Sequence, residues 1–281
     1  VDVAVERDDA AVFELRERVD LGERQIAVEE RSGQPRREAG QRRELPAGRM
    51  RVIGGKLRGH PVTGDGGSFN ITTTQDFRME ASGTTLALVD LNGVNGGNLV
   101  VTAGTSIFID GPINASQEVD PNGFGGTIIL SGTDVTTTNR GDINNSAASF
   151  GAGGDVSITA NGAANLAGEL FLQGGQSGGG AVDITATGLV ALSGTINVSA
   201  LGAGFGDGGS IDISAGGNVT VDGQINGRSS GDSADLNGAG AAADFSIIAN
   251  GNIAINEVMT FTGAAPDGEG GDLDFLALGS F

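Results

Sequence analysis

Glycine pairs recur along this chain at nearly constant intervals. The pairs begin at residues 66, 96, 125, 153, 179, 208 and 270, and Gly240–Ala241 is taken as the substituted pair between the last two. Successive pairs therefore start 26 to 32 residues apart. Because self-similarity at such a period is the signature of a repeat architecture, the chain is expected to build its fold from one unit used many times.

Each unit contains three short segments that alternate apolar and polar residues. In one unit these segments are SIDIS, NVTVD and QING, at residues 210–214, 218–222 and 224–227. A period of two predicts β-strands, and the Val, Ile and Thr in these segments suit a pleated, half-buried surface. Three strands are too few for a propeller blade, and the two-residue turns of a hairpin meander are missing.

The sequence therefore predicts an all-β fold, a right-handed parallel β-helix over residues 61–281. About eight coils of ~29 residues, with three short strands each, account for the repeats. The right hand follows from the general preference of parallel crossovers. Since the repeats run to the end of the sequence, a fragment of a longer solenoid is one interpretation.

Two rows of residues follow from stacking equivalent strands. The apolar positions of the first strand are expected to face inward and form the core, and the residue three positions past each pair belongs to an outward row. The inward positions are Phe69, Ile71, Leu99, Val101, Ile128, Leu130, Val156, Ile158, Val182, Ile184, Ile211, Ile213, Phe245, Ile247, Leu273 and Phe275.

A second row is polar. Asn114, Asn144, Asn197 and Asn226 occupy the same place in their units, with Phe171 in the matching slot of the unit between. Stacked asparagines exchange amide hydrogen bonds between neighbouring chains, so we expect a structural ladder of these four residues at a turn.

The charge is divided unevenly. Residues 1–60 hold 13 of the 16 Lys and Arg with 12 of the 35 Asp and Glu, which leaves residues 61–281 with 3 basic and 23 acidic residues, a net charge of −20. Such a body repels nucleic acid and anionic lipid, so neither nucleic-acid binding nor insertion of this segment into a membrane is expected.

Residues 1–60 differ in kind from the repeats. Val12, Leu15, Val19 and Ile26 have the spacing of an amphipathic helix over residues 11–30, and the stretch after Pro35 has the composition of a solvated linker. Two interpretations stay open, a charged tail that is helical in part or disordered, and a wrongly assigned start of the chain.

Chemistry is limited by what the chain lacks. It contains no cysteine, and His60 is its single histidine, so thiolate sites, catalytic triads and histidine metal clusters are excluded. His60 itself is interpreted as a linker residue.

The outward row of the first strand contains the strongest candidates for chemistry. Asp183 and Asp212 are expected to be direct neighbours on adjacent coils. Paired carboxylates bind calcium or act as acid and base in glycan cleavage, which gives two alternatives, a calcium-stabilised matrix or surface-layer protein and a polysaccharide lyase or hydrolase. Against catalysis, the repeats have only three arginines and neither Trp nor Tyr, so a solvated acidic face is favoured and no cofactor other than calcium is expected.

The units follow the pattern GGxVxITAxGxVxLxGxINxS, which resembles the repetitive β-helix regions of bacterial secreted and surface adhesins, both filamentous-haemagglutinin-like proteins and autotransporter passengers. This resemblance implies a non-enzymatic, rod-like segment of an exported protein on the surface of a Gram-negative bacterium. It further implies a surface receptor or glycan as partner, with lateral self-association of the rods as a second contact. Loops at 114–124 and 226–242 are the expected recognition surfaces.

Overall fold

The computed structural model describes residues 4–6, 13–20, 23–30, 50–59, 64–118, 122–148, 150–201, 206–229, 240–264 and 268–280, the first three ranges by their backbone alone. Within these ranges the regular structure consists of strands. The predicted all-β class is confirmed.

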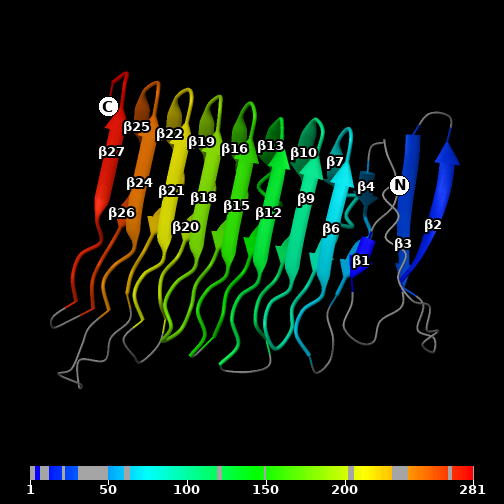
Figure 1. Cartoon of the computed structure of the whole chain (residues 1–281), viewed down its shortest axis with the longest axis horizontal. Coiled ribbons are helices and arrows are strands. Elements are labelled where there is room, and N and C mark those ends of the chain that lie inside the picture. The colour runs from blue at the N-terminus through cyan, green and yellow to red at the C-terminus, as the bar shows by residue number, and fades with distance from the viewer. Residues whose placement is uncertain are drawn as a thin grey trace.

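Three parallel sheets run along the length of the molecule (Figure 1). The first sheet contains β6 (Ser68–Thr73), β9 (Asn98–Ala103), β12 (Thr127–Gly132), β15 (Asp155–Ala160), β18 (Ala181–Ala186), β21 (Ser210–Ala215), β24 (Asp244–Ala249) and β27 (Leu273–Ala277). The second contains β4 (Met50–Ile53), β7 (Phe77–Glu80), β10 (Ser106–Ile109), β13 (Asp134–Thr137), β16 (Ala164–Leu166), β19 (Val190–Leu192), β22 (Val219–Val221) and β25 (Ile253–Ile255). The third contains β5 (Lys56–Arg58), β8 (Leu88–Asp90), β11 (Ile113–Asn114), β14 (Ile143–Asn144), β17 (Leu170–Phe171), β20 (Ile196–Asn197), β23 (Ile225–Asn226) and β26 (Met259–Thr260).

The chain visits the three sheets in turn and then steps to the next coil, which makes a parallel β-solenoid of about seven turns. The three strands per coil and the period of ~29 residues match the prediction. Strands β4 and β5 precede residue 61, so the sheets begin inside the segment expected to be a separate tail.

The core fills the space between the sheets. From Phe69 to Ile247, every predicted inward residue is at most 2% exposed. The strand pattern explains this result, because alternate residues of a strand point to opposite faces and the coils stack equivalent residues. Burying each such side chain contributes about 1.5–3 kcal/mol.

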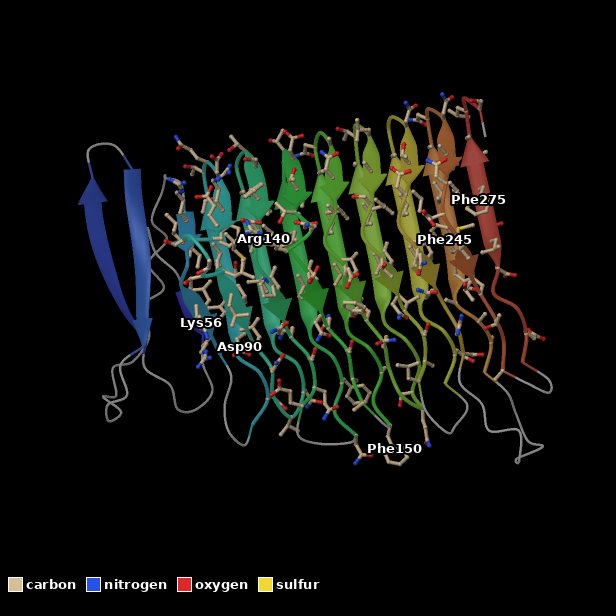
Figure 2. All side chains as sticks on the ribbon, turned by 180° about the vertical axis from the view of Figure 1, so that it is seen from behind. Lys56, Asp90, Arg140, Phe150, Phe245 and Phe275 are labelled. Atoms are coloured by element: carbon tan, nitrogen blue, oxygen red, sulfur yellow. The ribbon has the colours of Figure 1, made fainter. Side chains whose placement is uncertain are left out.

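The last predicted core positions are wrong in part. Leu273 is 46% exposed, and Phe275 is only partly buried. Both lie on β27, the edge strand of the first sheet, so a neighbouring coil covers them on one side alone. Figure 2 shows Phe275 beside Phe245 at this end, and their rings meet edge to face at 5.6 Å.

A backbone hydrogen bond closes successive coils at the glycine pair, from Gly67 to Ala243. The second residue of the pair donates its N–H to the carbonyl that follows the third strand, as Gly126 does to Ala115 at 2.9 Å and Gly180 to Leu172 at 2.7 Å. The same bond joins Gly97 to Leu91, Gly154 to Asn145, Gly209 to Val198 and Ala243 to Gly227. These coils are thus closed where the third strand ends and the next first strand begins.

The closing bond separates a part of the unit whose length is nearly constant from a part whose length varies. The accepting carbonyl lies 18 or 19 residues after the preceding pair in five coils, as from Gly154 to Leu172 and from Gly126 to Asn145. By contrast, the number of residues between the acceptor and the donor differs from coil to coil. The short segment 92–96 and the long segment 228–242 are the two extremes. The uneven spacing of the pairs therefore arises mainly in these loops, outside the closed coil.

Glycine is needed at the pair because backbones approach closely there. A Cβ atom on Gly126 would lie 1.8 Å from the carbonyl oxygen of Gly97, one coil earlier, and a Cβ on Gly209 would lie 1.8 Å from that of Gly180. No side-chain rotation relieves a clash with a backbone oxygen, so an alanine at Gly126 or Gly209 would require a coil to move.

One coil replaces the pair, and the replacement differs from the one expected. Ala242–Ala243, not Gly240–Ala241, occupies the slot, because Ala243 makes the closing bond. The facing position there is Gly227, whose Cβ would lie 2.4 Å from that of Ala243. Gly227 is the residue whose carbonyl accepts the closing bond, a position that carries a side chain in other coils, such as Ala115 and Leu172.

The expected helix over residues 11–30 is wrong. Strands β2 (Phe13–Asp20) and β3 (Glu23–Glu30) pair antiparallel, with Leu15 opposite Val28. The apolar residues that suggested a helix also fit a period of two through Phe13, Leu15 and Val19, and pairing of the two strands favours that period. Strand β1 (Ala4–Glu6) pairs antiparallel with β6 at the edge of the first sheet.

The close approach of backbones gives a prediction. Gly126→Ala is expected to lower the free energy of unfolding by about 1–3 kcal/mol, because the new methyl group pushes two coils apart. Denaturant titration measures the loss. Gly270→Ala is the control, since a Cβ there meets nothing within 4 Å, and its effect should stay within about 0.5 kcal/mol. Equal losses in the two variants would contradict the explanation.

Candidate binding groove

The glycine pairs form the floor of an open groove with a volume of about 620 Å³. Five consecutive coils contribute to it, with pairs or their equivalents at Gly125–Gly126, Gly153–Gly154, Gly179–Gly180, Gly208–Gly209 and Ala242. With neighbouring strands about 4.8 Å apart, five coils extend over roughly 19 Å. The groove therefore runs along the long axis of the solenoid, across its coils.

The backbone of the floor is engaged by the fold. The first residue of each pair donates its N–H to the next coil, from Gly125 to Ala152, from Gly153 to Gly178 and from Gly208 to Ala241. The second residue makes the closing bond within its coil. These donors are therefore committed, and recognition of a ligand falls to the side chains along the walls.

The walls carry carboxylates, hydroxyls and an aromatic ring. Asp155, Asp207 and Asp244 are exposed, and the lining residues include neither Lys, Arg nor His. Thr127 and Ser210 add hydroxyl groups, and the ring of Phe124 is 51% exposed at one end. The walls thus offer hydrogen-bond acceptors and one apolar face.

Two wall carboxylates also cap the neighbouring coil. Asp207 accepts the N–H of Ala241 through Oδ1 at 2.8 Å, and Asp244 accepts that of Asp272 at 3.1 Å. Each of these bonds engages one carboxylate oxygen. Other turns use the same contact, for example Asp134 with the N–H of Ala163 at 2.8 Å, which gives part of the acidic surface a structural role.

A buried asparagine beside the groove was not singled out by the sequence. Asn145 is fully buried, and its Oδ1 accepts the N–H of Gly126 while its Nδ2 donates to the carbonyls of Gly126 and Asp155. It thereby links the third strand to the groove floor. In adjacent coils Ala115 and Leu172 occupy the same inward position. A polar residue among apolar ones at this position is the sequence signal that could have revealed Asn145.

The four asparagines of the predicted ladder lack the hydrogen bonds that Asn145 makes to the groove floor. Strand register places Asn114 beside Asn144 and Asn197 beside Asn226, with Phe171 between the two pairs. Among the described residues, no hydrogen bond joins one of these amides to the next, and the Oδ1 of Asn144 has no partner. Asn197 accepts the N–H of Ser199 at 3.1 Å. The residues stack as expected, whereas an amide ladder stays a prediction.

Asp183 and Asp212 are register partners on β18 and β21, and both are exposed. Thr185 donates a hydrogen bond to Asp183 at 3.3 Å. In the part of the chain that the structure describes, no three acidic, histidine or cysteine side chains form a group able to hold a metal ion. Calcium prefers six to eight oxygen ligands, so binding at this pair stays a prediction that needs ligands from elsewhere.

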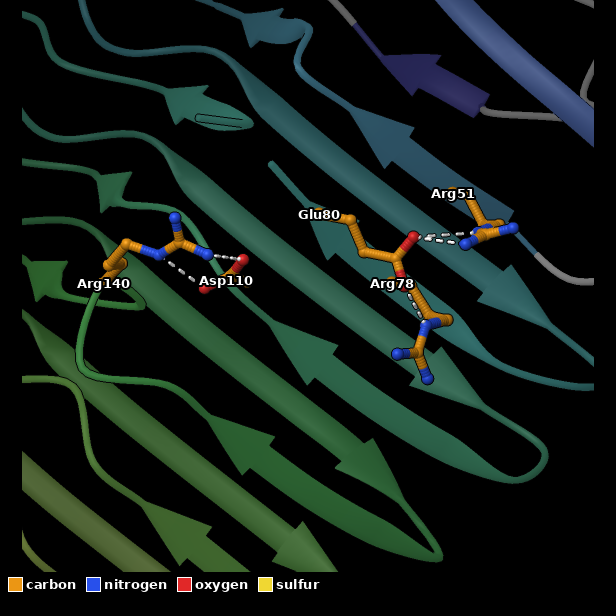
Figure 3. Close-up of polar contacts among 5 residues, drawn as sticks. All are labelled: Arg51, Arg78, Glu80, Asp110 and Arg140. Atoms are coloured by element: carbon orange, nitrogen blue, oxygen red, sulfur yellow. Dashed lines mark hydrogen bonds and ion pairs between the residues drawn. The ribbon is translucent and has the colours of Figure 1, made fainter. Parts of the chain in front are cut away.

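Three arginines on or next to strands of the second sheet are engaged in ion pairs (Figure 3). Arg78 donates to Glu80 at 2.6 Å, as does Arg51 through Nε at 3.1 Å, and the Arg78 guanidinium lies 4.4 Å from the centre of the Phe108 ring. Arg140 binds Asp110 through two nitrogens. These guanidinium groups stabilise carboxylates of the sheet surface.

The ion pairs shift two pKa values. Partial burial raises the pKa of Glu80, but hydrogen bonds and positive charge from Arg78 and Arg51 outweigh it, so this pKa lies below its usual 4.5. For Asp110, burial is likewise outweighed by hydrogen bonds from Thr138 and Arg140 and by the Arg140 charge, which places the pKa below 3.8.

Some expected features fall outside the described residues, namely His60, residues 31–49, and parts of the loops 114–124 and 226–242. The described residues contain no helix with the length and hydrophobicity that a membrane crossing requires. Comparison with known proteins gave no matching family model, no matching curated protein and no matching solved structure.

The two neighbouring asparagines give a prediction. Asn145→Ala is expected to cost about 1–3 kcal/mol of unfolding free energy, because it removes three hydrogen bonds from a buried site. Asn144→Ala, one residue away and half-buried, should cost less than about 0.5 kcal/mol. Urea denaturation compares them. A larger loss in Asn144→Ala would instead support the amide ladder.

The ion pairs predict a pH dependence. A carboxylate whose pKa is lowered by folding stabilises the protein above its unfolded pKa, and this contribution disappears as the pH falls through the folded value. Wild type should therefore exceed Glu80→Gln in unfolding free energy by about 1 kcal/mol near neutral pH. The difference should begin to fall near pH 4.5 and vanish once the pH lies below the lowered pKa of folded Glu80. A difference that persists unchanged in acid would rule out the ion pair as its source.

Proposed function

We propose that this chain is a non-enzymatic, rod-like segment of an exported bacterial surface protein, which presents an adhesive surface to a glycan or receptor. The observation that carries the proposal is the closing bond of each coil. It keeps the stacked core constant while the loops outside it differ in length, from residues 92–96 to residues 228–242. A scaffold that tolerates such variation suits recognition, because binding residues concentrate on loops held by rigid elements.

The charges support a binding role over a catalytic one. Cleavage of a polysaccharide needs a cation or donor beside the developing negative charge. Arg78 and Arg140, two of the three arginines after residue 61, are held by Glu80 and Asp110. The third, Arg228, follows β23 of the third sheet, whereas Asp183 and Asp212 lie on strands of the first sheet.

The cellular location of the protein is proposed from the resemblance of its repeats to those of bacterial surface adhesins. A Gram-negative cell surface is the expected location, and lateral contact between rods is an additional mode of association. The acidic body disfavours nucleic acid and anionic membranes as partners. The calcium-stabilised matrix protein remains the alternative that rests on Asp183 and Asp212.

Binding without turnover tests the proposal. Purified protein is run by affinity electrophoresis through gels that contain neutral, amino or acidic polysaccharides, and the same mixtures are assayed for new reducing ends and unsaturated products. We expect retardation by at least one polysaccharide and no product. Product formation that disappears in Asp183→Ala or Asp212→Ala would establish the enzyme instead, and the absence of retardation by every polymer would contradict glycan binding.

A further inference from the structure

The geometry of the groove points to one class of ligand: we infer that it binds a linear glycan whose sugars carry free amino groups. This inference rests on the proposed glycan-binding function and specifies its site and ligand. The ligand lies along the solenoid axis over the glycine pairs, with its ammonium groups against the wall carboxylates.

The shape of the groove selects an extended polymer. Its lining comes from five consecutive coils, from Phe124 to Asp244, and extends over roughly 19 Å at about 4.8 Å per coil. Glycine pairs keep the floor free of side chains, so a flat chain can lie close to the backbone. A linear glycan offers a repeating unit of similar length to the coil spacing.

The hydrogen bonds of the floor argue against an extended peptide. A peptide that adds to a sheet gains its affinity from main-chain hydrogen bonds. In this groove the pair N–H groups already donate to the next coil or across their own coil, as those of Gly153 and Gly154 do. A ligand must therefore bind through its own side groups to side chains of the walls.

The charge of the walls selects amino sugars. Asp155, Asp207 and Asp244 supply acceptors from coils along the groove, and none of the lining residues is basic. Carboxylates pair with ammonium groups and repel the carboxylate or sulfate groups of acidic glycans. The half-exposed Phe124 ring offers an apolar surface on which a sugar ring packs.

The experiment measures binding of a β-1,4-linked glucosamine hexamer to the full chain by isothermal titration calorimetry. The probe is compared with its N-acetylated form, an oligogalacturonate and hexalysine. We expect the glucosamine hexamer to bind, with affinity that falls as salt rises. The acidic oligomer should not bind, and the N-acetylated form and hexalysine should bind at least about tenfold more weakly, a difference of 1.4 kcal/mol.

A triple variant with a matched control locates the site. The combined change Asp155→Asn, Asp207→Asn and Asp244→Asn keeps the Oδ1 acceptors of the coil caps and should weaken binding more than about fivefold. The control changes Asp134, Asp142 and Asp222 to Asn, which removes the same charge outside the groove and also keeps their Oδ1 contacts. Circular dichroism confirms that both variants are folded.

Three results would overturn the inference. These are no binding of the glucosamine hexamer, equal weakening by the groove variant and its control, and equal binding of hexalysine. Retention on another polysaccharide in the electrophoresis experiment would then still support the proposed function, so the two failures are distinguishable.

Discussion

The structure depends on one backbone contact, the hydrogen bond that closes each coil at the glycine pair. There the third strand of a coil meets the beginning of the next first strand, and the N–H of Gly126 or Gly180 reaches a carbonyl across the coil. At the same position the chain stacks on the previous coil so tightly that a Cβ on Gly126 would lie 1.8 Å from a carbonyl oxygen. Ala243 makes the same closing bond without glycine at the donor position, with Gly227 as the acceptor, so this coil preserves the bond rather than glycine itself.

This contact also connects the fold to the groove. Residues that must lack side chains to let the coils stack leave a trough along the axis, and the loops outside the closing bond differ in length without disturbing the core. Asp207 and Asp244 have a role in both the fold and the groove. One oxygen of each caps the neighbouring coil, and both residues line the groove wall. The features that make the solenoid stable therefore also shape the surface proposed to bind a glycan.

Much of the fold follows from the sequence because the repeat and the period of two are local signals. The alternation placed Ile128 and Leu130 in the core, and the pair spacing placed Asp183 beside Asp212. An error of one position in a strand assigns a residue to the wrong face, since neighbouring residues face opposite sides. The spacing predicts a structural role for Asn144, whereas its neighbour Asn145, on the opposite face, makes the buried hydrogen bonds.

Other features depend on contacts that spacing does not reveal. Residues 13–30 fit a helix and a hairpin about equally by pattern, and strand pairing favours the hairpin. The substituted pair at Ala242–Ala243 is recognised only from its closing bond to Gly227, and the groove appears only when five coils are stacked.

Native-state hydrogen exchange at the glycine pairs tests the central role of the closing bond most directly. If this bond closes each coil, the amide protons of Gly126, Gly154, Gly180 and Gly209 exchange as slowly as those of the core strands β12, β15 and β18. Fast exchange at these four glycines, at rates like those of the surface loops, would show that the coils are held together by the core alone and would contradict the account.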